Sequence, residues 1–324
     1  MVDPVLCSQA IVSRSYQKRV NIKIRNILRS SARRLLKTAT YVPYVFSNTG
    51  GKTPILVYHR VCPLHFKKDI VYANVYPEEF ERQMLYLKRN FDVVTVSEYL
   101  DRRSGGLLNG SEICITFDDG FRDNYVYAFP VLKKNGLKAA FFIVTKYIGG
   151  NDLFGWMPMD GAARQDSISN RERWRPLSWE EVREMMEYGM EFGTHTHTHR
   201  ASLAEMGPEE ARGEIEKSTA VFRQKTGTDS RLFSYPHGTS KDYNSHHVLI
   251  LKSLDYRAAL TTTIGRNGPR QNPFELKRII VYEDDSLLEF KKKVNGAYDM
   301  AAPLQRVWLK VAGTNADDVR IPEN

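Results

Sequence analysis

The sequence predicts an α/β fold in which parallel strands alternate with helices. Short apolar runs rich in β-branched and aromatic residues, typical of buried strands, recur along most of the chain. Between them lie segments with the apolar spacing and the end signals of helices. Alternation of the two favours a parallel sheet with helices outside it, because each helix carries the chain back to the start of the next strand.

The first part of this pattern covers residues 54–145. Strands are expected at 54–59, 91–96, around 113–115 and at 138–145. A helix with a proline at its start is expected at 77–89, and another begins after an N-cap at Ser97. A third is expected at 121–135, where Gly136 ends it.

The second part begins with a long irregular segment, 149–176. We interpret it as a substrate-side loop with exposed Trp156 and Trp174, because aromatic rings suit the apolar faces of sugars; core packing is the alternative. A helix is then expected at 179–188, where Ser178 and Glu181 form a capping box. Further helices are expected at 208–226 and 285–294, and further strands at 256–263 and 275–281.

Two adjacent carboxylates, Asp118 and Asp119, follow the third strand and precede Gly120. Neighbouring carboxylates repel each other, so they are costly to bury unless a cation or a proton lies between them. At a strand's end, where glycine lets the backbone turn, both can face one point. We interpret the pair as one metal-binding and one proton-accepting carboxylate; an ordinary Asp-rich turn is the alternative for this segment taken alone.

Three histidines at alternate positions, His195, His197 and His199, follow the helix expected at 179–188. On a strand they would share one face, and on a helix the first and third would lie one turn apart. Imidazole is the commonest metal-ligating side chain, and two histidines with one carboxylate leave positions open for water. A His/Thr-rich surface loop is the alternative, but it leaves the Asp pair unexplained.

Together these two segments resemble the motifs of the polysaccharide deacetylases, carbohydrate esterase family four. The family's first motif, Thr-Phe-Asp-Asp-Gly, is present as Thr116–Gly120, and its second, two histidines four residues apart, as His195–His199. The resemblance covers about 54–294. It implies a distorted (β/α) barrel of seven or eight parallel strands, with the site at their carboxyl ends.

The resemblance also implies roles for individual residues. Asp119, His195 and His199 would bind the metal, usually Zn²⁺, although another divalent ion is an alternative. Asp118 would be the catalytic base. His197 falls at a variable position of the motif and is not counted as a ligand.

The family's third motif, commonly Arg-x-Pro-Tyr, is altered in this chain: Ser234 replaces the arginine and His237 replaces the tyrosine. His237 can still offer its backbone N–H to an oxyanion, as the residue after proline does in the family. The missing arginine normally orients the base, and Arg278 is the candidate to replace it. The terminal Leu-x-His that supplies the family's general acid is not found, so His237 or His59, at the end of the first strand, would serve.

Composition divides the chain into three expected parts: a basic segment with its linker at 1–50, a deacetylase domain at 51–300 and a polar tail at 301–324. The net charge is +9, of which residues 1–40 carry +8, so the catalytic body is nearly neutral. Three cysteines suggest no disulfide framework. No apolar run is long enough to span a membrane.

The basic segment reads as an amphipathic helix over residues 11–39, which predicts contact of residues 11–40 with an anionic membrane surface. A helix docked on the body and a disordered tail are the alternatives. Charges interrupt every apolar core that a secretory signal would need. No nucleic acid is expected, because Tyr16 is the one aromatic residue interleaved with the charges. The expected location is cytoplasmic or peripheral on the membrane surface.

The resemblance therefore implies a hydrolase that removes N-acetyl groups from an N-acetylated polysaccharide or a lipid-linked glycan precursor. An amidase acting on a non-sugar amide is one alternative. A non-catalytic glycan-binding relative is another, because the motif arginine and terminal histidine are missing. Retention of Asp118, Asp119, His195 and His199 argues against such a loss of activity.

Overall fold

The computed structural model describes residues 51–63, 74–156, 166–297 and 299. The basic segment, the linker and the polar tail expected from the sequence lie outside these residues. Within the described part of the chain, no helix is both long enough and apolar enough to cross a membrane.

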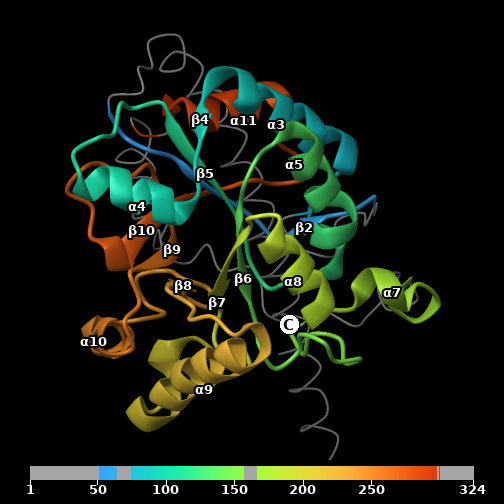
Figure 1. The fold of residues 1–324 in the computed structure, drawn as a ribbon, viewed down its shortest axis with the longest axis vertical. Coiled ribbons are helices and arrows are strands. Elements are labelled where there is room, and N and C mark those ends of the chain that lie inside the picture. The colour runs from blue at the N-terminus through green and yellow to red at the C-terminus, as the bar shows by residue number, and fades with distance from the viewer. Residues whose placement is uncertain (1–50, 64–73, 157–165, 298, 300–324) are drawn as a thin grey trace, which may run out of the picture.

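Seven parallel strands close into a barrel (Figure 1). In order around the barrel they are β1 (Ile55–Tyr58), β10 (Leu276–Ile280), β9 (Ala258–Ile264), β8 (Leu232–Ser234), β7 (Glu191–Thr194), β6 (Ala140–Ile143) and β5 (Glu112–Phe117), which pairs again with β1. The short β4 (Asp92–Val93) extends the sheet beyond β5, and β2 (Arg60–Val61) pairs separately with β3 (Asn74–Val75). The predicted parallel barrel is confirmed.

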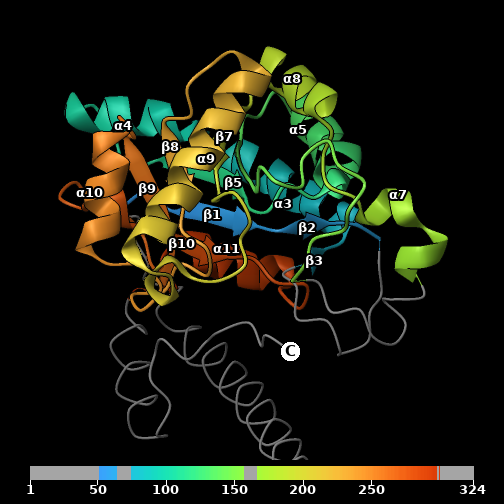
Figure 2. The ribbon, with the colours of Figure 1, turned by 90° about the horizontal axis from the view of Figure 1, so that it is seen from below.

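Helices surround this barrel, as Figures 1 and 2 show. They are α3 (Pro77–Asn90), α4 (Val96–Ser104), α5 (Phe129–Asn135), α7 (Arg171–Trp174), α8 (Trp179–Glu187), α9 (Pro208–Thr226), α10 (Ser245–Ser253) and α11 (Leu287–Val294). A π-helical turn, η1 (Asn124–Ala128), precedes α5, and 3₁₀ turns form at η2 (Leu203–Glu205) and η3 (Pro273–Glu275). The capping box of Ser178 and Glu181 at α8 is confirmed.

The prediction that Ser97 caps a helix is wrong. Thr95 is the N-cap of α4, because its side chain accepts a hydrogen bond from the Glu98 N–H while the Glu98 carboxylate accepts one from the Thr95 N–H. This reciprocal pair starts the helix two residues earlier than predicted. It also leaves only Asp92–Val93 of the expected strand 91–96.

The long segment before α8 is only partly a surface loop. Trp174 is 1% exposed and packs with Cys62, Phe121 and Phe154, with the Arg60 guanidinium 4.3 Å from its ring centroid. Core packing, the alternative interpretation, therefore holds for Trp174.

The residues of β5 alternate between two apolar clusters, which defines the inside and the outside of the barrel. Cys114 packs with inward residues of other strands and with Val96 and Tyr99 of α4. Ile113 and Ile115 pack in the other cluster, which lies between the strands and the surrounding helices. Cys62 and Cys114 are both buried.

Gly193 lets β7 fit between β6 and β8. A Cβ atom there would lie 2.6 Å from the Leu232 carbonyl oxygen and 2.6 Å from the Phe142 ring. We expect Gly193→Ala to lower the free energy of unfolding by about 1–3 kcal/mol, because backbone and a buried ring would have to move. Urea unfolding measures this.

Gly213 on the exposed side of α9 is the matched control, because no atom lies within 4 Å of its added Cβ. We expect Gly213→Ala to raise the free energy of unfolding by about 1 kcal/mol, the difference in helix propensity between the two residues. Equal changes in the two variants would contradict the packing argument at Gly193.

Candidate metal and catalytic site

The predicted site residues meet at the carboxyl ends of the barrel strands. Asp118 and Asp119 directly follow β5, His195 follows β7, and His59 follows β1. Arg278 belongs to β10 and Ser234 ends β8. Parallel strands bring their carboxyl ends to one edge, so residues far apart in the sequence become neighbours there.

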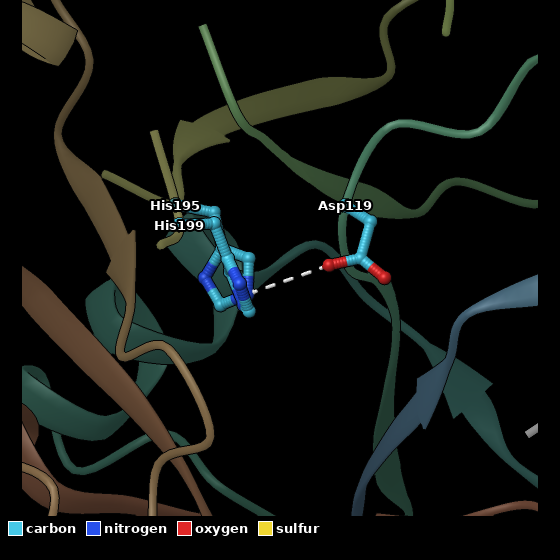
Figure 3. A group of neighbouring side chains, drawn as sticks. All are labelled: Asp119, His195 and His199. Carbon is cyan, nitrogen blue, oxygen red and sulfur yellow. Dashed lines mark ion pairs between the residues drawn. The ribbon is translucent and has the colours of Figure 1, made fainter. Parts of the chain in front are cut away.

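Three buried side chains form a candidate metal site. One ligand atom from each of Asp119, His195 and His199 lies within 4.8 Å of the other two. Figure 3 shows the Asp119 carboxylate facing the two imidazoles, with His195 Nε2 3.7 Å from Asp119 Oδ1. His197 does not belong to this group, and its Nδ1 lies 3.0 Å from Thr145 Oγ1 instead.

Hydrogen bonds fix the orientation of the first histidine. His195 Nδ1 lies 2.7 Å from the Ser234 carbonyl oxygen, which can only accept. Nδ1 therefore carries the proton and Nε2, which faces Asp119, offers a lone pair. The buried Nδ1 of His199 has no hydrogen-bond partner among the described residues, as suits an atom that binds something other than the protein.

The backbone at this site is in an unusual conformation. Five non-glycine residues of the described chain have positive φ, and four of them belong to this region: Asp119, Thr196, His199 and His237, with φ of 75°, 61°, 52° and 58°. Left-handed backbone at such residues costs on the order of 1 kcal/mol each. The fold therefore holds Asp119 and His199, two of the three predicted ligands, in a conformation that local preference alone would not select.

Burial sets the protonation of the candidate ligands. It lowers the pKa of His195 to about 4 and that of His199 well below its ordinary value, so both imidazoles are neutral at pH 7 and can donate a lone pair. Burial, with the neighbouring Asp118 charge, raises the pKa of Asp119 well above its usual range. A bound cation would relieve this cost, and one carboxylate with two imidazoles suits Zn²⁺ or a similar ion. The residues thus fit a divalent metal.

Arg278 holds Asp118 in a bidentate pair. Its Nη1 lies 2.8 Å from Asp118 Oδ1 and its Nη2 lies 2.7 Å from Oδ2. Both side chains are buried, at 0% and 2% exposed. Burial alone would raise the pKa of Asp118, but the charge of Arg278 and then that of His195 outweigh it and hold this pKa well below its usual range. Asp118 is therefore ionised and able to accept a proton.

Ser234 completes this arrangement, which the sequence did not indicate. Its hydroxyl accepts from Arg278 Nη2 at 2.9 Å and donates to Asp118 Oδ2 at 3.2 Å. Arg278 Nε donates to the Thr261 carbonyl at 2.8 Å. The serine that replaces the motif arginine thus lies beside the arginine contributed by β10.

The two candidate acids both lie near the site. Burial lowers the pKa of His59, against the opposing effect of Asp118, while Arg278 also lowers it. The ring centroid of His237 lies 5.3 Å from that of His199, and Thr262 Oγ1 donates to the His237 carbonyl at 2.5 Å.

One neighbour of the site belongs to the predicted substrate-side loop. The Trp156 ring centroid lies 4.4 Å from that of His199 at an interplanar angle of 32°. The aromatic composition of this loop was the available signal, but its contact with a specific histidine was not predictable.

Comparison with known families agrees with this geometry. Residues 107–259, which contain both Asp residues and all three motif histidines, match the sequence model of the family described as polysaccharide deacetylase. Over these residues the chain matches the polysaccharide deacetylase family. It is an enzyme of the hydrolase class, and the predicted family resemblance is confirmed.

Two curated relatives extend this match. YxkH of Bacillus subtilis strain 168, provisionally named a polysaccharide deacetylase, is 29% identical over 239 residues, which cover 71% of this chain and 72% of YxkH. The poly-β-1,6-N-acetyl-D-glucosamine N-deacetylase of Staphylococcus aureus strain N315 is 23% identical over 263 residues, covering 75% and 83%.

A solved structure shares the fold of this polysaccharide deacetylase. The Streptococcus pyogenes deacetylase PplD, solved with acetate, superposes with a TM-score of 0.62 at 23% identity and covers 75% of this chain and 98% of its own. At this identity the likeness concerns the barrel fold alone.

Proposed function

We propose that this polysaccharide deacetylase is a metal-dependent N-deacetylase that hydrolyses the acetamido groups of an N-acetylated polysaccharide. The observation that carries the proposal is the buried triad of Asp119, His195 and His199 beside an ionised Asp118 held by Arg278. This combination supplies both a cation site and a proton acceptor.

Asp119, His195 and His199 would hold the metal, Zn²⁺ or another divalent ion. Because Asp118 is so acidic, it is a weak base towards ordinary water. When bound, the metal supplies the complementary chemistry: it lowers the pKa of the attacking water and polarises the acetyl carbonyl.

The chain's own groups would carry the proton and the charge. Asp118 takes a proton from the water that attacks the acetyl carbon. Asp118 Oδ2 already accepts from both Arg278 and Ser234, whereas Oδ1 accepts from Arg278 alone and keeps a second lone pair for that proton. The backbone N–H of His237 would donate to the oxyanion. When the C–N bond breaks, the protonated imidazole of His237 or His59 would give its proton to the leaving amine, and Asp118 would then release to solvent the proton that it took from water.

The proposed substrate is a polymer of N-acetylglucosamine, or its lipid-linked precursor. Support comes from the Staphylococcus aureus relative, whose name specifies the β-1,6-linked polymer. The test is acetate release, with matching appearance of free amines, from β-1,6- and β-1,4-linked N-acetylglucosamine oligomers and from a non-sugar N-acetyl amide. Release from at least one glycan supports the proposal. Release from the amide alone would replace it with the amidase alternative, and metal binding without any release would indicate a binding protein.

We also propose that residues 11–40 bring the enzyme to an anionic membrane surface, where a lipid-linked substrate lies. The support is that this segment combines apolar residues at helical spacing with many basic side chains. We expect the whole chain to sediment with vesicles containing anionic lipid, and deletion of residues 1–40 to abolish this. Equal sedimentation of the two forms would contradict the proposal.

A further inference from the structure

The turn that follows β7 decides whether His199 can reach the metal site. In an extended chain, the Cα atoms of residues four apart would lie about 13 Å from each other, and their side chains would be similarly far apart. Here the ring centroids of His195 and His199 are 4.7 Å apart. The chain folds back through two left-handed non-glycine residues, Thr196 and His199. This turn, residues 196–199, therefore needs support from outside itself.

One carboxylate on a neighbouring helix supplies part of that support. Glu214 Oε2 accepts from the backbone N–H of His197 at 3.0 Å and from that of Thr198 at 2.8 Å. Glu214 Oε1 accepts from Thr198 Oγ1 at 2.9 Å. The helix α9, which carries Glu214, lies beside β7 in both views (Figures 1 and 2). Successive N–H groups next to a left-handed residue form a concave anion site, and Glu214 fills it.

The opposite side of the turn is held by the segment after β6. The Thr145 N–H donates to the Thr196 carbonyl at 3.4 Å, and the Lys146 N–H donates to the His197 carbonyl at 2.9 Å. The preceding Val144 N–H donates to the Asp119 carbonyl at 3.3 Å. The His195 N–H in turn donates to the Ile143 carbonyl at 2.9 Å. This segment thus connects the backbone of Asp119, of His195 and of the turn, and Glu214 holds the turn from the helix side.

We infer that Glu214 is a positioning residue of the metal site, which fixes the turn 196–199 so that His199 faces His195 and Asp119. The inference rests on the proposed function, since it takes these three residues as the metal ligands. Hydrogen bonds to an ionised acceptor are stronger than neutral ones, so a half-buried carboxylate suits a turn with strained backbone. Glu214 touches neither substrate nor metal and acts through the backbone.

The test compares zinc affinity of metal-free proteins by competition with a coloured chelator. We expect Glu214→Ala to weaken zinc binding by about 10- to 100-fold, the range found for residues that orient metal ligands. Glu214→Gln should lie closer to the wild type, because an amide can turn its oxygen to the two N–H groups and its NH₂ to Thr198 Oγ1. Thr198→Val removes one of the three hydrogen bonds and should weaken binding less than Glu214→Ala.

The control is Glu216→Ala on the same helix. Glu216 is exposed and pairs with Arg212 at 2.9 Å, away from the turn, so its loss should leave zinc affinity unchanged. With saturating Co²⁺, the visible absorption bands of Glu214→Ala should differ from those of the wild type, because the His199 ring is less well placed. A change in stability alone would not alter these bands.

Wild-type zinc affinity and an unchanged cobalt spectrum in Glu214→Ala would overturn the inference, and so would the same result for Thr198→Val if Glu214→Ala does not fold. The Thr198→Val comparison keeps the test decisive even if Glu214→Ala does not fold. Failure of the proposed function is a separate result, because it shows in the wild type itself, either as no Zn²⁺ or Co²⁺ bound at this site or as no acetate released from any glycan.

Discussion

Asp118→Asn is expected to lower kcat by about 10²- to 10⁴-fold, the usual contribution of a general base. The amide has nearly the same shape but cannot take a proton from water. Asp119, His195 and His199 remain in place, so the metal content should stay the same. Acetate release under saturating substrate and elemental analysis of the same sample measure the two quantities.

Asp101→Asn is the matched control, because Asp101 is an exposed carboxylate paired with Arg257 away from the strand ends. It should keep wild-type kcat. If Asp118→Asn retained the turnover of this control, another group would have to accept the proton and Asp118 would not be the base.

Arg278→Met is expected to affect activity, pH dependence and stability together. It leaves a buried carboxylate without its bidentate partner, a loss that typically costs about 3–5 kcal/mol of unfolding free energy at neutral pH. Without the arginine, burial raises the pKa of Asp118, so the acidic limb of the kcat/KM profile should move to higher pH. Turnover should fall while metal content is spared. Rate profiles and urea unfolding across the pH range measure these effects.

The pH dependence of stability should change in a defined direction. In the wild type the folded-state pKa of Asp118 lies below its unfolded value. Its stabilising contribution is therefore present above the unfolded pKa and is lost as the pH falls through the folded pKa. In Arg278→Met the folded pKa lies higher, so protonation at acidic pH relieves the buried charge. The stability difference between the two proteins should shrink as the pH is lowered.

Arg266→Met removes another enclosed arginine, which pairs with Asp299 at 3.0 Å outside the site. Arg266→Met should lower the free energy of unfolding without moving the acidic limb of the kcat/KM profile. An Arg278→Met enzyme with unchanged turnover and an unchanged acidic limb would show that Arg278 does not control Asp118.

The parts of the fold that follow local rules could be predicted from the sequence. The apolar runs and helix caps gave the strand–helix alternation, and the capping box of Ser178 and Glu181 lies where expected. Arg278 is predicted to orient Asp118 because the motif arginine is missing, and the structure places its guanidinium in bidentate contact with the Asp118 carboxylate. Its effect on turnover stays a prediction.

Other features depend on tertiary contacts that no local pattern encodes. The choice between Thr95 and Ser97 as N-cap was decided by the reciprocal bond with Glu98. Trp174 was expected beside the substrate, but the Arg60 guanidinium and the surrounding aromatic rings enclose it. Glu214 lies on a polar helix with no motif, and only the fold brings its carboxylate to the turn that carries His199.

The central claim is that Asp119, His195 and His199 bind a metal that the deacetylation requires. Elemental analysis beside acetate release, for the wild type and for His195→Ala, tests it most directly. We expect one divalent ion per chain in the wild type, and loss of both metal and acetate release in the variant. A wild type that releases acetate without any bound metal, or a variant that keeps both, would contradict it.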